Sequence, residues 1–250
     1  MRFEHLARAF GQAIGEALAE NGKFRFDSFR FDGEDAEDWQ TLEEIRLTVA
    51  APTVLKVALG RHDIVRVRED DKLSIEVEGG PEAETALRFL VSEDSVKIAR
   101  RRDAKADKLV IDIAMPAPGG ISIGGAGRVE AVALAADATL KIGGSGHIAV
   151  ENVAATRLTA KIGGSGTIVA KGSAEELKLK IGGSGHFLSP ELSVERAHIS
   201  IGGSGRAEVA CEGEVEARIG GSGDIVINGT PKVSLHAGGS GRLRCEPSAD

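Results

Sequence analysis

The sequence predicts an all-β protein: a single-stranded, right-handed parallel β-helix with coils of 18–20 residues and a short helical and aromatic cap at its N-terminal end. Two observations predict this fold. A glycine-rich tetrad, GG[SA]G, recurs along the second half of the chain, and apolar residues alternate with polar ones on both sides of each copy. The tetrads begin at Gly124, Gly143, Gly163, Gly182, Gly202, Gly220 and Gly238.

The residues around the tetrads indicate strands on both sides of each glycine turn. An isoleucine directly precedes the first glycine in six of the seven copies, and further apolar columns lie two residues before that isoleucine and five residues after the glycine. Alternation with a period of two is typical of β-strands. One such repeat cannot bury its apolar face alone, so the copies must stack as successive coils with a shared core.

Three segments divide the chain. Residues 121–250 hold the regular tetrad coils, whereas residues 41–120 keep the alternation without the tetrad, in stretches such as VLKVAL at 54, IVRVRE at 64 and LVIDIAM at 109. We expect irregular first β coils, or a region rich in hairpins, in this middle segment. Residues 1–40 form the third segment and hold seven of the nine aromatic residues.

The N-terminal segment combines a predicted amphipathic helix with an aromatic and acidic stretch. Phe3, Leu6, Phe10, Ile14 and Leu18 fall on one helical face, and FRFDSFRF and EDAED follow. We expect this segment to cover the open first coil, because a solenoid must protect its end from edge-to-edge pairing. Docking onto a partner, self-association and binding to a membrane surface are the alternatives.

Composition and charge argue against several classes of protein. The 42% of apolar residues suffices for a core, and the net charge of −7 argues against general nucleic-acid binding. No apolar run is long enough to span a bilayer, so we expect no transmembrane segment. Charges and glycines interrupt FEHLARAFGQAIGEALAENGK, so the N-terminus does not resemble a secretory signal. As written, the chain looks cytoplasmic, or like a form without its signal.

The glycines do not predict a nucleotide or calcium site. Phosphate-binding glycine loops open a helix, whereas every tetrad here runs into another strand. Calcium β-rolls place an aspartate at the sixth position of a nine-residue repeat, but Asp224 is at the fifth position of GGSGDIVIN and the other copies lack it. No cofactor is therefore predicted.

Catalysis is not predicted either. The candidate acids Glu151, Glu191, Glu208 and Asp224 sit at different offsets in their repeats, so none lines up with an acidic partner on the next coil. His147 and His186 lie two coils apart, about 9.6 Å, which is too far to share a metal ion. The same spacing separates Cys211 from Cys245, and we expect free thiols.

Basic residues do line up beside the tetrads. They occupy the outward positions two residues before and just after the glycines, and on an acidic chain they predict a stripe that attracts an anionic polymer such as an acidic glycan. The alternative is an ordinary solvated strand face. The residues of this stripe are Arg128, Lys141, His147, Lys161, Lys180, His186, Arg206, Arg218 and Arg242.

The stretches TVLKVALGRHDIVRV, LSIEVE and VKIAR, followed by serial IGGSGxI coils over roughly residues 41–245, resemble the bacterial family of auto-transporter adhesin head domains called GIN domains. The resemblance implies a parallel β-helix, an adhesin-like role with a polysaccharide or protein surface partner, and a place at the cell envelope or outside the cell. It supplies no catalytic residues.

This sequence departs from the family at its N-terminus, where family members usually carry an export signal or lipoprotein segment. A cytoplasmic self-assembling scaffold, a homo-oligomer joined through the N-terminal segment or the coil ends, is therefore the alternative function. A polysaccharide-active enzyme is a more remote one, because other parallel β-helices carry such activities.

Overall fold

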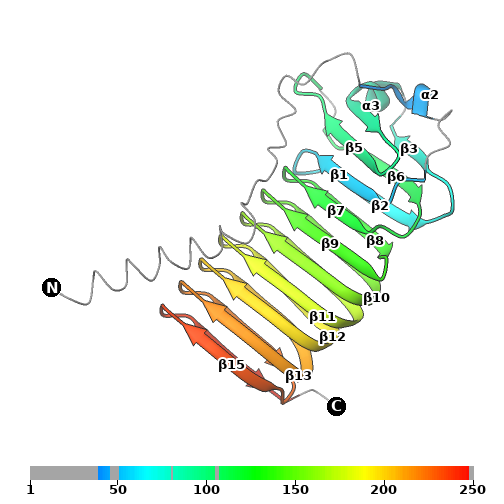
Figure 1. The fold of residues 1–250 in the computed structure, drawn as a ribbon. Coiled ribbons are helices and arrows are strands. Elements are labelled where there is room, and N and C mark those ends of the chain that lie inside the picture. The colour runs from blue at the N-terminus through cyan, green and yellow to red at the C-terminus, as the bar shows by residue number, and fades with distance from the viewer. Residues whose placement is uncertain (1–38, 46–50, 80, 105–106, 248–250) are drawn as a thin grey trace.

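The computed structural model describes residues 39–45, 51–79, 81–104 and 107–247. Its strands stack into a parallel β-solenoid, shown in Figure 1, so the predicted fold class is confirmed. The predicted cap over residues 1–40 lies outside the described residues apart from Trp39 and Gln40.

Each regular coil is one long strand bent at an elbow, and a tetrad corner joins it to the next. The half of a coil that leads into a corner and the half that leaves it lie in two layers, called here the pre-corner and post-corner layers. The regular strands are β10 (His147–Ile162), β11 (Thr167–Ile181), β12 (His186–Ile201) and β13 (Arg206–Ile219). Shorter strands continue the two layers at either end: β7 (Gly120–Ile123), β8 (Arg128–Ala133), β9 (Asp137–Ile142), β14 (Asp224–Asn228), β15 (Lys232–Ala237) and β16 (Arg242–Glu246).

The first coils are irregular and contain hairpin-like antiparallel pairs, so both features expected of the middle segment occur together. Their elements are α2 (Leu42–Ile45), β1 (Val54–Ala58), β2 (Ile64–Glu69), β3 (Ser74–Glu78), α3 (Pro81–Thr85), β4 (Leu87–Val91), β5 (Ser95–Arg100) and β6 (Val110–Met115). Strand β1 lies between β5 and β7, and β2 lies between β6 and β8, so the first coil in sequence is the second in space.

Antiparallel strands close the N-terminal end of the solenoid. Strand β4 pairs antiparallel with β5, and β3 with β6. The outer edge of β4 is covered in turn by Gln40, whose backbone exchanges hydrogen bonds with Phe89 at 2.8 and 3.3 Å and whose side chain accepts the Val91 N–H at 3.1 Å. Leu42 and Ile45 of α2 are buried beside it. This end therefore has a built cap.

The inward columns predicted from the tetrads form one continuous core. The isoleucines before the corners, from Ile123 to Ile219, are buried, and so are the columns on either side of them. Phe89 and Phe187 are the largest fully buried side chains. Parallel pairing in register lets like residues stack on like residues from coil to coil, which keeps the core uniform.

The corner glycines permit close stacking of coils. Their backbone is not left-handed: positive φ angles occur at Gly79, Gly172 and Gly229, none of which belongs to a tetrad. A Cβ at Gly183 would lie 2.6 Å from the Gly164 carbonyl oxygen of the preceding coil. The backbone also bonds across this gap, as where the Ser145 N–H donates to the Gly125 carbonyl at 3.2 Å. Glycine in the tetrads therefore serves the close approach of coils and not a left-handed backbone.

Two adjacent glycines test this explanation. Gly183→Ala should lower the free energy of unfolding by about 1–3 kcal/mol, because its Cβ meets backbone that cannot move aside. Gly182→Ala should be nearly neutral, because its Cβ would lie 3.9 Å from its nearest neighbour on the preceding coil, the Ile162 carbonyl oxygen. Chemical denaturation of both variants measures the difference. Equal destabilisation would contradict the stacking explanation.

The corner of the first coil uses an aspartate in place of a tetrad. The fully buried carboxylate of Asp63 accepts the Gly60 N–H at 2.8 Å, the Leu109 N–H at 3.0 Å and Arg100 Nη1 at 2.7 Å. The Asp63 carbonyl accepts the Arg128 N–H at 3.0 Å. Asp63 thus ties the β1–β2 corner to the coil of β5 and β6 through its side chain, and to the coil of β8 through its backbone carbonyl.

Asp63→Ala should be among the most destabilising single changes in the protein. It leaves the mostly buried Arg100 guanidinium without this carboxylate and removes the acceptor of two backbone N–H groups, so we expect a loss of about 3–5 kcal/mol in the free energy of unfolding. Asp94→Ala, at an exposed turn in the same region, is the control and should lie within about 0.5 kcal/mol of the parent. Urea denaturation compares the two.

Candidate functional site

The basic residues before the corners form a ladder in exact strand register. Lys141 faces Lys161 on the next coil, and Lys161 faces Lys180. In the other direction the column passes through Ser122 to Lys56 of β1, and Lys56 faces Lys97 of β5. At about 4.8 Å per coil, the five steps from Lys97 to Lys180 span about 24 Å. Lys56, Lys97, Lys141, Lys161 and Lys180 are called the lysine ladder below.

The lysine ladder has no counter-ion within the described parts of the chain. None of its five ammonium groups makes an ion pair or hydrogen bond with a described side chain, although like charges repel at this spacing. The pKa of Lys161 is lowered, first by partial burial and then by the charges of Lys141 and Lys180 on the adjacent coils. The ladder is therefore a concentration of positive charge that the described residues leave uncompensated.

The basic column after the corners is different, because carboxylates neutralise its arginines. The column runs in register from Arg128 through His147, Thr167, His186, Arg206 and Asp224 to Arg242. Its ion pairs are Arg128–Glu130 at 2.6 Å, Arg206–Glu208 at 3.2 Å and Arg242–Asp224 at 3.6 Å.

Two further members of the predicted stripe also contribute little positive charge. The pKa of His147 is lowered, by burial first and then by the neighbouring charge of Arg128, so its ring is mainly neutral at pH 7. Arg218, in the same column as the lysine ladder, is paired with Glu216. Of the two predicted columns, only the one that contains the lysine ladder retains a run of unpaired cations among the described residues.

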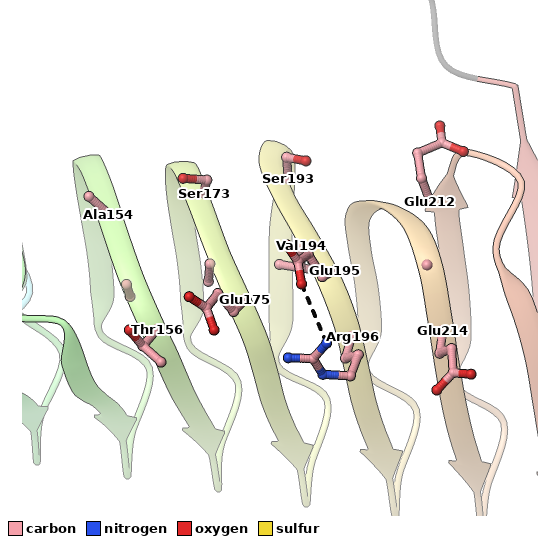
Figure 2. A pocket seen from close by; sticks show the side chains of 13 residues that line it. Ala154, Thr156, Ser173, Glu175, Ser193, Val194, Glu195, Arg196, Glu212 and Glu214 are labelled. Atoms are coloured by element: carbon pink, nitrogen blue, oxygen red, sulfur yellow. Dashed lines mark hydrogen bonds and ion pairs between the residues drawn. The ribbon is translucent and has the colours of Figure 1, made fainter.

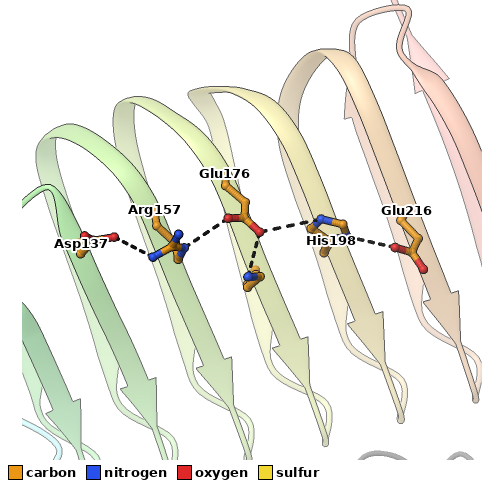
Figure 3. Close-up of polar contacts among 6 residues, drawn as sticks. Asp137, Arg157, Glu176, His198 and Glu216 are labelled. Atoms are coloured by element: carbon orange, nitrogen blue, oxygen red, sulfur yellow. Dashed lines mark hydrogen bonds and ion pairs between the residues drawn. The ribbon is translucent and has the colours of Figure 1, made fainter. Parts of the chain in front are cut away.

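A charge network, drawn in Figure 3, lies on the same layer as the ladder, because Arg157 and Lys161 belong to the same half of β10. Arg157 bridges Asp137 at 3.1 Å and Glu176 at 3.2 Å, and His198 lies between Glu176 at 3.8 Å and Glu216 at 3.1 Å. A hydrogen bond from Lys178, followed by the Arg157 interactions, lowers the pKa of Glu176. Carboxylates on this face thus compensate other cations.

The elbow, at the far edge of each coil from the tetrads, carries an acidic groove of about 730 Å³ (Figure 2). Small residues such as Ala154, Ser173 and Ser193 line it on successive coils, which leaves room above the backbone. Four carboxylates and one arginine belong to its lining: Glu175, Glu195, Glu212, Glu214 and Arg196. The two edges of the coil therefore carry opposite charge.

Two of these carboxylates meet on neighbouring coils. The register pairs Ala174 with Val194 and Glu176 with Arg196, which places Glu175 beside Glu195. Counting from the preceding tetrads missed this pair because Glu175 is 12 residues after Gly163 and Glu195 is 13 after Gly182. Both side chains are exposed, and Glu195 is 3.4 Å from Arg196. The pair lacks the enclosed, water-excluding surroundings typical of glycosidase acids.

The acids named from the sequence do not pair with one another. Glu208 faces Leu188 and Val226 on the adjacent coils, and Asp224 faces Arg206 and Arg242. The described residues contain no group of three or more histidine, cysteine, aspartate or glutamate side chains placed to hold a metal ion. In the same residues, no helix combines the length and apolarity needed to cross a membrane.

The cysteines are free thiols in different surroundings. Cys211 is buried, and its pKa is raised mainly by that burial. Cys245 faces Ile227 in an inward column, yet its side chain is exposed because it belongs to the last described coil.

The family model described as "Putative auto-transporter adhesin, head GIN domain" matches residues 55–231, from the first strand of the irregular coils to the start of the last coil. The chain belongs to this family. The resemblance seen in the sequence is therefore confirmed, and the GIN domain accounts for the solenoid in Figure 1. No curated protein matches the chain.

Solved structures of similar fold come from Bacteroides and Parabacteroides species. A putative adhesin from Bacteroides fragilis is 21% identical, with a TM-score of 0.71 over 79% of this chain and 94% of its own. A putative adhesin from Parabacteroides merdae is 17% identical, with a TM-score of 0.56 over 79% and 93%. A putative lipid binding protein from Parabacteroides distasonis is 16% identical, with a TM-score of 0.58 over 80% and 94%. At these identities the likeness supports the fold alone.

Opposite effects on stability are expected from two cations of the same strand. Lys161→Ser should leave the free energy of unfolding unchanged or slightly raise it, because the charged ammonium is repelled by Lys141 and Lys180 below its lowered pKa. Arg157→Ser should lower it by about 0.5–1 kcal/mol, because two carboxylates lose their partner.

Denaturation at low and high salt checks both signs. Added salt should reduce the difference in the free energy of unfolding between each variant and the parent, because the interactions are electrostatic and exposed. A clear loss of stability in Lys161→Ser at low salt would show that the ladder is compensated after all.

Proposed function

We propose that the GIN domain of this chain is a non-catalytic, adhesin-type binding module that holds an anionic polymer, such as an acidic glycan, along the lysine ladder. The observation that carries the proposal is the register of Lys141, Lys161 and Lys180 without a counter-ion among the described residues, continued by Lys56 and Lys97. The adhesin family supports binding to a surface partner.

The ladder suits a polymer better than a small anion. Its ammonium groups lie on coils about 4.8 Å apart over about 24 Å, with one gap at Ser122, so an extended chain with regular carboxylates or sulfates can contact several of them at once. Lysine carries a point charge on a flexible stem, which adapts to either group. Binding also removes the repulsion that lowers the pKa of Lys161.

Charge on the other edge gives the ligand one place to bind. The acidic groove at the elbow repels a polyanion, and the post-corner column is neutralised by its own carboxylates. A polyanion approaching the coil from solution is therefore steered to the pre-corner layer.

The triple variant Lys141→Ser, Lys161→Ser, Lys180→Ser should weaken binding to an immobilised polyanion by at least about tenfold, because three cationic contacts are lost. Serine already occupies this column at Ser122 and Ser200, so the coils accept it. Biolayer interferometry with heparin and polygalacturonate, as sulfated and carboxylated probes, measures the affinity at low and high salt.

A variant with the same change in net charge is the control. Lys72→Ser, Lys108→Ser, Lys171→Ser removes two exposed lysines and the half-buried Lys171, all outside the ladder, and should keep most of the affinity. If the two triple variants lose binding equally, general charge and not the ladder holds the polymer. If the parent binds neither probe at low salt, the proposed function is wrong.

A further inference from the structure

The C-terminal end of the solenoid exposes residues that belong to core columns. Val233 and Leu235 of β15 are 37% and 44% exposed, whereas Val215 and Ala217, which face them on the preceding coil, are 2% and 0% exposed. Strand β15 pairs only with β13, and β16 only with β14, so β15 ends the described stack in Figure 1. The sequence thus continues its core pattern into a coil that nothing described covers.

The backbone of this last coil is also open along both strands. The Gly238 N–H donates to the Ile219 carbonyl at 2.8 Å, and the Arg242 N–H to the Gly223 carbonyl at 3.0 Å. Residues alternate in the side to which their N–H and C=O groups point. The groups of Val233 and Leu235 in β15, and of Leu243 and Cys245 in β16, therefore point away from the preceding coil.

The two ends of the solenoid differ. At the N-terminal end, antiparallel β3 and β4, Gln40 and α2 cover the coil edges. At the C-terminal end, the described residues offer two coplanar strand edges with an apolar strip between them. A partner that pairs with both edges must itself present two strands, separated by the distance between the pre-corner and post-corner layers.

We propose that this end is the interface of a homodimer, in which β15 and β16 pair antiparallel with the same strands of a second copy. A twofold axis through Ser234 and Arg244 generates both pairings. These residues lie at similar distances from the corner, four residues before Gly238 and three after Gly241. Such an interface uses the same patch on both copies and closes after two.

The side chains of the last coil fit this register. Val233 faces Leu235 of the second copy, and Leu243 faces Cys245 of the second copy, so the cores join. The same two pairs bring together the backbone groups that point outward, as an antiparallel ladder requires.

Charge selects this register over its neighbour. With the axis at Ser234 and Arg244, Arg242 faces Glu246 of the second copy twice, against one facing pair of Arg244 side chains. In β15 the same axis sets Lys232 opposite His236 of the second copy. Moving the axis one residue toward the corner keeps the apolar contacts but sets Arg242 against Arg244 of the second copy twice. Opposite charges across a strand pair stabilise it and like charges destabilise it.

The dimer would place two lysine ladders on one continuous face, because a twofold axis perpendicular to the sheet joins pre-corner layer to pre-corner layer. A long polymer could then contact both copies, which raises its avidity. The interface does not depend on the proposed function, and its tests need no ligand.

Sedimentation equilibrium of the full chain tests the assembly. The parent should have twice the chain mass at about 100 µM, a concentration above the Kd expected of a standard-size interface. The double variant Val233→Lys, Leu235→Lys should remain folded, because both positions are exposed in the single copy. Its dimer dissociation constant should rise by at least about a hundredfold, because dimerisation would bury the new ammonium groups against one another. Val132→Lys, at a position 48% exposed on β8, is the control and should stay dimeric.

A monomeric parent overturns the proposal, and so does a dimer that survives the double variant. A monomer whose melting temperature falls in the double variant would mean that another segment of the same chain covers this end, which also overturns it.

Cross-linking tests the register. In a Cys245→Ser background, Ser234→Cys sets two thiols across the axis at a non-hydrogen-bonded pair, where Cα atoms are about 4.5 Å apart and a disulfide can form. Oxidised glutathione, reduced to two glutathione thiols, takes the two electrons and two protons. We expect a covalent dimer on non-reducing gels, and none from Ser165→Cys at an exposed corner. Equal yields from both cysteines would overturn the register.

Discussion

The structure depends on how closely one coil lies on the next at the tetrad corners. There the backbone bonds directly to the backbone of the preceding coil, and a Cβ at the second or last glycine of a tetrad would collide with a carbonyl oxygen or an isoleucine methyl group. This contact fixes the register of every coil on its neighbour. Register in turn stacks isoleucine on isoleucine inside the solenoid and lysine on lysine outside it.

Register also explains why a chain of net charge −7 has a strongly basic strip. A charge that recurs at one position of a repeat becomes a row of like charges about 4.8 Å apart unless the sequence alternates its sign. Beside the ladder the sign does alternate, and Asp137, Arg157 and Glu176 compensate one another. In the ladder it does not, so the fold retains an unfavourable arrangement that a polyanion would relieve. Binding surfaces typically keep arrangements of this kind, which lower the stability of the fold.

Much of this architecture could be predicted from the sequence. The tetrad spacing and the alternation around it gave the coils, the inward columns and the outward position of Lys141, Lys161 and Lys180. The place of Lys56 and Lys97 could not be predicted, because β1 inserts between β5 and β7 and no tetrad marks its register. The pairing of Glu175 with Glu195 was missed for a related reason, since coils of unequal length shift the elbow relative to the corner.

Side-chain chemistry set a second limit on prediction. The sequence showed two basic columns of similar composition, but only the structure shows that Glu130 and Glu208 neutralise arginines of one of them. The last coil keeps the alternation of the other coils apart from Ala237 in place of an isoleucine, and nothing in that alternation reveals that no further described coil follows it.

A crystal structure of the full chain with a sulfated oligosaccharide would show directly whether the lysine ladder is the binding surface. We expect sulfate oxygens within hydrogen-bonding distance of the ammonium groups of Lys141, Lys161 and Lys180, with the sugar chain running across the coils. An oligosaccharide bound in the groove at the elbow, with the lysine ladder empty, would contradict it.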